Sequence, residues 1–321
     1  MLLAFGGIGW GAWFAFSPVD LQANLVDFSI QPGSGLRSSA RQIQDAGVAM
    51  PPWQFELLGR VMGKAAMIKA GSYEVSRGVT PWRLLAQITQ GDYQLSEIVF
   101  IEGWTFIQLR AALDANPALR HDSAGLGDEQ LMARIGAPAT HPEGWFFPDT
   151  YLFAKGSSDL EILKRATRMM EKQLQAAWAQ RSADAALKTP LEALVLASII
   201  EKETGRADER PRIGMVFNNR LRIGMMLQTD PTVIYGLGEE FKGNLKKEHL
   251  LRDGPFNTYT RAGLPPRPIA MPGMGSLLAA VNPAKGGELY FVARGDGSSQ
   301  FSRTLAEHNR AVQKYQLSGR R

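Results

Sequence analysis

The segment LEALVLASIIEKETG, residues 191–205, decides how the larger part of the chain folds. Its content is nearly continuously apolar until the last turn, so a helix over residues 191–204 would be buried in a core. That turn holds Glu201 and Glu203, and Gly205 ends the helix. Carboxylates there face the negative end of the helix dipole, which disfavours each by about 0.3 to 1 kcal/mol. The segment therefore predicts a core helix and a candidate reactive carboxyl.

The two glutamates differ in the direction they face. They are two residues apart, or about 200° around a helix, so they cannot face the same substrate atom. Glu203 follows Ile199 and Ile200 by about one turn, so it can lie at the mouth of a groove floored by the apolar helix. Burial and the helix end both raise a carboxyl pKa, and acid catalysis of glycosidic cleavage requires a protonated carboxyl. We expect Glu203 to react and Glu201 to be its neighbour; the alternative is a solvated helix end.

Three polar clusters are candidates to line that groove. They supply the amide, hydroxyl and aromatic groups that sugar rings with N-acetyl arms need for hydrogen bonding and stacking. The clusters are Asn218, Asn219 and Arg220; Gln228, Thr229 and Asp230; and Asn257, Thr258 and Tyr259. Each has an alternative interpretation as a turn or a helix cap, since Asn, Thr and Asp before Pro or Gly commonly serve there.

Composition excludes several other chemistries. The 321 residues include no cysteine, which excludes disulfides, thiolate metal sites and cysteine nucleophiles. The four histidines are not paired at ligand spacing, and neither a GxSxG elbow nor a GxxxxGK[ST] phosphate loop occurs. The net charge of +5 is spread along the chain, without the basic and aromatic runs of a nucleic-acid groove. We therefore expect no metal, no cofactor and no nucleic-acid partner.

The N-terminal region predicts a membrane anchor. Residues 1–19 carry no charged side chain and are rich in Leu, Ala, Phe, Gly and Trp. Spanning a bilayer takes about 20 apolar residues, so the stretch is just long enough. It shows neither a basic leader nor a small-residue cleavage site, which favours an uncleaved single-pass anchor over a cleaved signal peptide. We expect a protein of the inner membrane with its catalytic part in the periplasm.

The remaining chain divides into two regions of an α+β protein. Residues 24–95 mix strand and helix patterns, with strands over 24–30 and 71–78 and helices over 38–44, 53–64 and 81–91. Residues 96–321 are mainly helical, with helices expected over 159–181, 191–204, 209–221 and 305–316. The sequence therefore predicts a small module followed by a larger, mainly helical domain.

Six motifs, met in order along the chain, carry a resemblance to a known family. They are EGW, EGWFFPDTY, ASIIEKET, RLRIGMMLQTDPTVIYGLG, FNTYTRAGLPP and LYFVARGDG. From about Asn24 onward the chain resembles the YceG-like or MltG family of endolytic murein transglycosylases. The resemblance implies an inner-membrane helix over 1–19, a LysM-like module over 24–95, and a catalytic domain with lysozyme-like features over 96–321. It also implies that Glu203 is catalytic. We expect Glu201 and Glu143 to support it from neighbouring positions.

The resemblance implies cleavage of the β-1,4 bond between N-acetylmuramic acid and N-acetylglucosamine in nascent peptidoglycan strands. Glu203 would protonate the leaving oxygen and then deprotonate the muramoyl C6 hydroxyl, closing a 1,6-anhydro ring. An intramolecular attack needs no second carboxylate about 5 to 5.5 Å away, as a retaining hydrolase would. The expected role is to terminate glycan elongation, with peptidoglycan synthases as possible partners. The alternatives are a water-using, lysozyme-type hydrolase and a non-catalytic wall-binding scaffold.

Two positions depart from the family pattern. Phe256 stands where the family usually has the first Tyr of YNTY, and Arg267 replaces a small residue of GLPPGPI. Neither is the proposed acid. The departures therefore put the substrate preference in question and leave the expected reaction unchanged.

Overall fold

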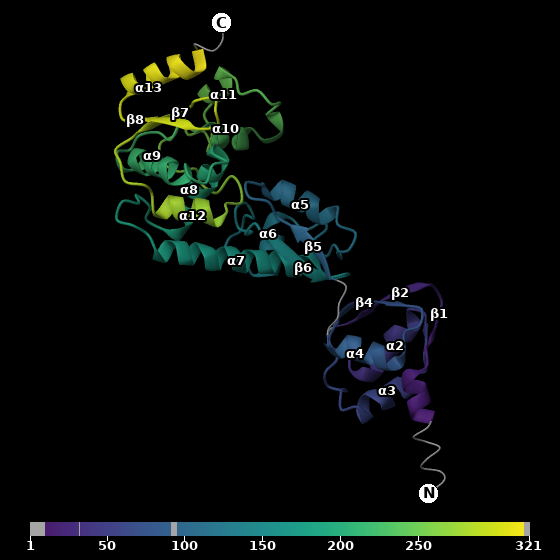
Figure 1. The fold of residues 1–321 in the computed structure, drawn as a ribbon. Helices are drawn as coiled ribbons and strands as arrows, with labels where there is room; N and C mark the ends of the chain where they lie inside the picture. Colours follow the sequence, from purple (N-terminus) through teal and green to yellow (C-terminus); the bar gives the residue numbers. More distant parts are fainter. Residues whose placement is uncertain (1–9, 32, 91–94, 318–321) are drawn as a thin grey trace. The chain divides into compact units, whose positions relative to one another are not determined.

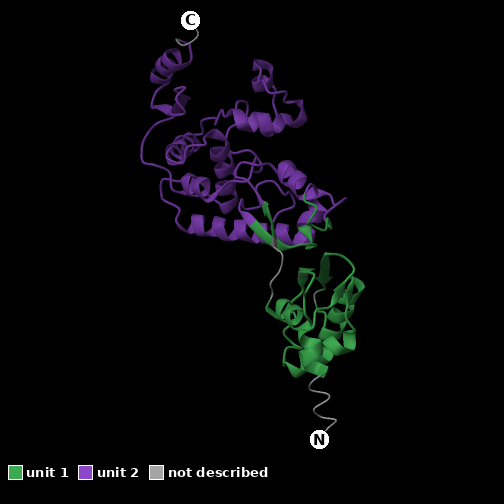
Figure 2. Cartoon of the chain, turned by 45° about the vertical axis from the view of Figure 1, so that its right-hand side comes forward, with its two compact units in different colours: residues 1–98, 116–122, 151–159 green, residues 99–115, 123–150, 160–321 purple. Residues whose placement is uncertain are grey.

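The computed structural model describes residues 10–31, 33–90 and 95–317. The chain forms two units, coloured separately in Figure 2. The first contains residues 1–98, 116–122 and 151–159, and the second contains residues 99–115, 123–150 and 160–321. The main boundary lies between Ile98 and Val99, and two short later segments belong with the first unit.

The first unit is built on an antiparallel strand pair with helices around it. Strand β2 (Leu25–Ile30) pairs with β4 (Gly71–Ser76), and every second residue of β2 is buried. The buried side chains of that strand join those of α2 (Leu36–Asp45), α3 (Pro52–Val61) and α4 (Pro81–Gln90) in one core. A shorter pair links β1 (Asp20–Leu21) with β3 (Val48–Ala49). The predicted strands and helices of this region are confirmed.

The predicted membrane anchor is corrected by the structure. Residues 1–9 of the expected span lie outside the described residues. Residues 10–16 are helical, and this helix ends before Ser17 and Pro18. About 20 apolar residues in one helix are needed to cross a bilayer. Within the described ranges, no helix combines the necessary length with the necessary apolar content. This finding overturns the predicted single-pass anchor over residues 1–19 and the inner-membrane localisation drawn from it.

The core of the second unit is centred on α8 (Pro190–Glu203), which is buried from Ala193 to Ile200. Figure 1 shows this helix flanked by α9 (Arg210–Arg222) and α12 (Met274–Val281), and both helices pack against it. Helix α7 (Asp159–Ala179) adds buried side chains to the same core. The predicted helices over 159–181, 191–204 and 209–221 are confirmed, with their ends shifted by one or two residues.

Two local features fix α9 against its neighbours. A Cβ at Gly214 would lie 2.3 Å from the carbonyl oxygen of Ala279, so only glycine allows the backbones of α9 and α12 to approach this closely. One turn later, buried Asn218 donates to the oxygens of Gly214 (2.8 Å) and Ala280 (3.1 Å) and accepts a hydrogen bond from the nitrogen of Ala186 (2.7 Å). These contacts fix α9 against α12 and against the segment that precedes α8.

The chain contains several further helices and strands. They are β5 (Leu95–Val99), α5 (Phe106–Asp114), α6 (Asp128–Ile135), β6 (Thr150–Ala154), α10 (Asp230–Leu237), η1 (Gly238–Glu240), α11 (Lys247–Leu251), β7 (Tyr290–Ala293), β8 (Ser299–Ser302), α13 (Leu305–Val312) and η2 (Gln313–Leu317). Strand β5 pairs with β6, and β7 forms an antiparallel hairpin with β8. The helix predicted over 305–316 is α-helical only to Val312 and continues as a π-helical turn. Helices with small antiparallel sheets confirm the mixed fold class.

Candidate active site

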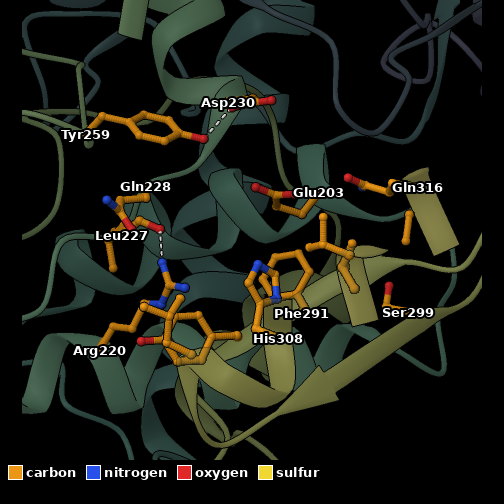
Figure 3. A pocket seen from close by; sticks show the side chains of 15 residues that line it. Glu203, Arg220, Leu227, Gln228, Asp230, Tyr259, Phe291, Ser299, His308 and Gln316 are labelled. Carbon is orange, nitrogen blue, oxygen red and sulfur yellow. Dashed lines mark hydrogen bonds between the residues drawn. The ribbon is translucent and has the colours of Figure 1, made fainter. Parts of the chain in front are cut away.

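Glu203 lies at the last position of α8 and borders a groove of about 540 Å³ in the second unit. The next residue, Thr204, has an extended backbone conformation, so the chain leaves the helix directly after Glu203. The Glu203 carboxyl group is left facing the groove. Figure 3 shows the groove between the end of α8, the segment before α10, the β7–β8 hairpin and α13. The polar side chains that line it are Glu203, Arg220, Gln228, Asp230, Tyr259, Tyr290, Ser299, His308 and Gln316.

The environment of Glu203 makes its carboxyl a proton donor and acceptor near neutral pH. Protein atoms surround most of the side chain, and this burial raises its pKa to about 7. A hydrogen bond from the Thr229 hydroxyl to Oε1 and the charge of Arg220 lower the pKa, whereas the charge of Asp230 raises it. Part of the side chain remains accessible from the groove. The carboxyl can therefore release and recover a proton under ordinary conditions.

The backbone before α10 is strained at the groove. Gln228 has a φ of 47°, and among the described residues it is the one position other than glycine with a positive φ. Such a conformation costs about 1 to 3 kcal/mol and persists where the surroundings enforce it. The Gln228 nitrogen donates to the oxygen of Thr258 (3.0 Å), which holds the bend. The bend leaves the Gln228 side chain on the groove and turns the Thr229 hydroxyl toward Glu203.

A buried threonine network positions Thr229. Its nitrogen donates to Thr258 Oγ1 (3.0 Å), and Thr258 Oγ1 shares a second hydrogen bond with Thr232 Oγ1 (2.9 Å). The Thr232 hydroxyl donates back to the Thr229 oxygen (2.8 Å). All three residues are almost fully buried. The second and third predicted clusters are therefore brought together, and one function of Thr258 is to hold the residue that contacts Glu203.

Asp230 and Tyr259 form a pair at the groove. The Tyr259 hydroxyl donates to Asp230 Oδ1 (2.5 Å), as Figure 3 shows, and both side chains line the groove. Burial first, and then the bond to Asp230, raise the pKa of Tyr259 above its ordinary value. The tyrosine is thus a neutral donor at any ordinary pH, and it orients the carboxylate that raises the pKa of Glu203.

Arg220 supplies the positive charge of the groove. Its Nε donates to the oxygen of Leu289 (2.6 Å) and its Nη1 to that of Leu227 (2.7 Å). The guanidinium also lies over the ring of Tyr290, at 5.3 Å from the centroid. These contacts join the end of α9 to the hairpin and to the segment before α10. Arg220 therefore both builds the groove and places a charge in it.

The three predicted asparagines, Asn218, Asn219 and Asn257, lie outside the groove lining. Asn219 donates from Nδ2 to the oxygens of Gly286 (3.1 Å) and Glu288 (3.0 Å), where it holds the loop before β7. Asn257 is buried, and its Oδ1 accepts a hydrogen bond from the nitrogen of Tyr259 (2.9 Å). Its Nδ2 donates to the oxygens of His249, Leu250 and Arg252. The Asn219 and Asn257 amides are both engaged with the backbone, and Asn257 influences the groove through the position of Tyr259.

Glu201 faces a different part of the protein from Glu203, as the helix geometry predicts. Its buried carboxylate forms an ion pair with Arg210 (2.9 Å) and accepts a hydrogen bond from the nitrogen of Gly273 (2.9 Å). Arg210 also contacts Glu102 at 3.2 Å. Glu201 thus fastens α8 to the start of α9 and to the residue before α12, and it does not line the groove.

Glu143 lies in a second buried polar cluster. Its Oε1 accepts a hydrogen bond from the nitrogen of Phe106 (3.0 Å), at the first turn of α5. Burial raises its pKa to about 7, against the lowering effect of that bond, of a hydrogen bond with Tyr235 and of the charge of Arg267. The residue is 3% exposed and does not line the groove. The structure thus separates Glu143 from the site that contains Glu203.

The two positions that depart from the family pattern contact each other. The Arg267 guanidinium lies 5.1 Å from the centroid of the Phe256 ring. The ring of Tyr235 meets Phe256 edge to face at 4.9 Å, and Tyr235 also hydrogen-bonds to Arg267. The face of the Phe256 ring therefore lies against the cation, and a cation–π contact of this kind contributes about 0.5 to 2 kcal/mol. The departures form one packing unit outside the groove lining.

The wall formed by the β7–β8 hairpin and α13 was not predicted from the sequence. It brings Tyr290, Phe291, His308 and other side chains to the groove from the last part of the chain. The motif LYFVARGDG contains the first two, but no local pattern connects it with α13 or with Glu203. Within the described ranges, no group of three or more His, Asp or Glu side chains is arranged to hold a metal ion.

A carboxyl with a raised pKa beside an open groove of amide, hydroxyl, charged and aromatic groups is an arrangement suited to acid–base catalysis. The chain belongs to the YceG-like family, whose sequence model matches residues 28–314. It is 32% identical over 308 residues to a Bacillus subtilis (strain 168) protein named endolytic murein transglycosylase, with 90% of this chain and 84% of that protein covered.

Two further relatives agree with this assignment. A Streptococcus pneumoniae protein (serotype 2, strain D39) with the same name is 24% identical over 331 residues, which cover 92% of this chain and 59% of the relative. The fold matches the 2.6 Å crystal structure of a YceG-like protein from Listeria monocytogenes with a TM-score of 0.56 and 28% identity. That match covers 89% of this chain and 98% of the other. The predicted family is therefore confirmed.

Proposed function

We propose that this protein is a lytic transglycosylase that cleaves peptidoglycan glycan strands, with Glu203 as its catalytic acid and base. The observation that carries the proposal is the position of this carboxyl: it ends a core helix, has a pKa of about 7 and opens onto the groove. The names of the relatives supply the substrate class, since they are murein transglycosylases. The resemblance in sequence and the chemistry of the site thus support the same activity.

In the proposed reaction, Glu203 gives its proton to the glycosidic oxygen while the bond from that oxygen to C1 of the muramoyl residue breaks. The muramoyl C6 hydroxyl then bonds to C1 and transfers its proton to the Glu203 carboxylate. The enzyme recovers its starting state, and no water is consumed. A pKa near 7 suits both steps, because neither protonation state of the carboxyl is strongly favoured over the other.

Other groove residues support these steps in the proposal. Gln228 offers an amide to the N-acetyl or hydroxyl groups of the sugar, from a backbone bend that fixes its direction. Asp230, held by Tyr259, raises the pKa of Glu203 and places negative charge where positive charge develops on the ring. The Thr229 hydroxyl orients the Glu203 carboxyl and stabilises it after the proton has left.

A water-using hydrolase is the second candidate, and Asp230 is the observation that favours it. This carboxylate also lines the groove, so it is available as a base for water or as a second carboxyl in a hydrolase. Its hydrogen bond with Tyr259 and its effect on the pKa of Glu203 give it another role in the transglycosylase. The two candidates predict different products.

The finer parts of the proposal concern the polymer and its context. We place the cut between N-acetylmuramic acid and N-acetylglucosamine of nascent strands, so that cleavage ends glycan elongation and peptidoglycan synthases become functional partners. Residues 24–95 would act as a LysM-like glycan-binding module. The arrangement of strand β2, helices α2 and α3, and strand β4, with the two strands paired antiparallel, supports this last point.

The test is product analysis. The full chain would be incubated with purified peptidoglycan, and the released fragments would be separated and weighed by mass spectrometry, with the Glu203→Gln variant as control. The proposal expects 1,6-anhydro ends, each lighter by one water than a reducing end. Reducing ends would establish the hydrolase instead. Binding without any cleavage would support a wall-binding scaffold.

A further inference from the structure

The groove extends beyond the residues that the proposed chemistry uses. Tyr290 from β7 and His308 from α13 line it together with Glu203, and neither takes part in the proton transfers described above. Both belong to the wall that joins the last strand pair to the last helix, and Figure 3 shows His308 among the groove-lining side chains. They are therefore available to contact parts of the substrate other than the reacting atoms.

Arg220, Tyr290 and His308 form one stacked cluster. The rings of Tyr290 and His308 are 5.2 Å apart, with an angle of 25° between their planes. The Arg220 guanidinium lies 5.3 Å from the same Tyr290 ring. Tyr290 therefore contacts both nitrogen-bearing groups and holds the imidazole and the guanidinium together in the lining of the groove.

The charge of Arg220 is not neutralised by an ion pair. In the part of the chain that the structure describes, its hydrogen bonds go to carbonyl oxygens, and no carboxylate forms a salt bridge with it. The nearby acid Glu203 has its pKa raised to about 7, so it offers only part of a compensating charge at neutral pH. A buried cation without a full counter-charge is unfavourable, and an incoming anion would relieve that cost.

His308 adds an unsatisfied polar group at the same place. Its Nδ1 is buried and has no hydrogen-bond partner among the described residues. A buried polar atom without a partner costs about 1 to 3 kcal/mol, and such an atom in a folded protein calls for an explanation. Burial and the charge of Arg220 both lower the pKa of this imidazole, so it is neutral at neutral pH and has one N–H to donate.

We propose that Arg220, Tyr290 and His308 form a subsite that binds a carboxylate carried by the glycan strand. The inference rests on the proposed function, since it assigns part of the same groove to a substituent of the same polymer. Peptidoglycan offers two sources of that group, the carboxylates of the stem peptide and the lactyl carboxylate of muramic acid once the stem is removed. The apolar side chains of the same wall, Phe291, Val292, Leu305 and Val312, would contact the aliphatic parts beside it.

The experiment compares three preparations of glycan strands. The first keeps its stem peptides, and the second has lost them, so that its lactyl carboxylates are free. The third is the second preparation with those carboxylates converted to methyl amides. The readout is the ratio of kcat/KM for a charged preparation to that for the neutralised one. We expect the parent protein to prefer a charged preparation by about tenfold, as for one or two hydrogen bonds to an ionised group. Preference for the first or the second preparation identifies the source of the carboxylate.

The variant His308→Phe keeps a ring against Tyr290 and removes both nitrogens. It should bring the ratio close to one, mainly by raising KM for the charged strands. His249→Phe, the same substitution outside the groove, should keep the parental ratio. If circular dichroism shows that His308→Phe unfolds at a clearly lower temperature than the parent, His308→Gln replaces it. This variant retains an N–H donor, so it should keep most of the preference for charged strands.

Binding separates this inference from the proposed function. Calorimetric titration of the Glu203→Gln protein with the same three preparations needs no cleavage, so it reports on the subsite even if the chain turns over no strand. Tighter binding of a charged preparation, lost in the double variant with His308→Phe, supports the subsite. Equal binding of charged and neutralised strands, or an equal loss on all three when His308 is replaced, overturns it.

Discussion

Glu203 and Glu143 are two carboxyls in one unit with the same raised pKa of about 7 and very different surroundings. Glu143 is enclosed, with its oxygen bound to the backbone of Phe106 and its neighbours Tyr235 and Arg267 around it. Glu203 is held by Thr229 but opens onto the groove. Burial alone is enough to raise a carboxyl pKa. Access to the groove, and not the raised pKa, is therefore what distinguishes Glu203 as the candidate catalytic group.

The largest expected effect is on turnover. Glu203→Gln keeps the shape of the side chain but cannot deliver a proton, so we expect the rate of anhydro-product formation to fall by about 10²- to 10⁴-fold. Glu143→Gln should change the rate by less than about tenfold, because that carboxyl does not line the groove. Timed digests of purified peptidoglycan, analysed by mass, give both rates. If both variants are folded and lose activity to a similar extent, the proposed difference between Glu203 and Glu143 is wrong.

The two carboxyls should behave alike in stability. The pKa of each is raised from 4.5 unfolded to about 7 folded, so each contributes stability below about pH 4.5 that is lost as the pH rises through 7. Either Glu→Gln variant should therefore gain stability relative to the parent between pH 5 and pH 8, by up to about 3 kcal/mol per site. Denaturant unfolding at the two pH values measures this gain. A variant whose relative stability does not change with pH would mean that its carboxyl is not buried in solution.

Gln228 and Asn257 extend the comparison to amides. Asn257→Ala removes the donor to three carbonyl oxygens, so it should cost about 1 to 3 kcal/mol of stability. Gln228→Ala removes a side chain exposed on the groove and should lower turnover while thermal unfolding stays close to that of the parent. Melting curves and digest rates of the two proteins separate these effects. A stable Asn257→Ala protein with reduced turnover would give that residue a role in binding.

The smallest expected effect is a shift in the pH–rate profile. Activity should fall as the pH rises through the pKa of Glu203, about 7. Thr229→Val removes a hydrogen bond that lowers this pKa, so the falling limb should move to higher pH. Asp230→Asn removes a charge that raises it, so the limb should move to lower pH. The measurement is the dependence of kcat/KM on pH for both variants. Glu143→Gln is the control, and its midpoint should equal that of the parent. If the Thr229 and Asp230 variants shift the midpoint in the same direction, the assignment is contradicted.

Local pattern was sufficient for the helices of the core and for the choice between two acids. The apolar run before Glu201 predicts α8, and the angle between positions 201 and 203 correctly separates a residue bound to Arg210 from one at the groove. The polar cluster at 228–230 was also found, because its residue types suit sugar binding. These inferences work since they depend on neighbours within a few residues.

Other parts depend on contacts that no local pattern contains. Asn257 looks like a sugar-binding amide in sequence, but its partners are carbonyl oxygens brought close by the loop after α11. His308 is a solitary histidine until the hairpin places it beside Tyr290 and the groove. The predicted anchor was wrong for a related reason: an uncharged composition does not by itself make a membrane-spanning helix, and no helix in the described ranges is long and apolar enough to be one.

The buried amide of Asn218 has a consequence for the order in which the second unit assembles. Its three hydrogen bonds join the segment before α8, the helix α9 and the helix α12, which are far apart in sequence. None of the three can form its full set of bonds until the others have docked, so they should fold and open as one cooperative step. In native-state hydrogen exchange, the backbone amides of these segments should share one opening free energy.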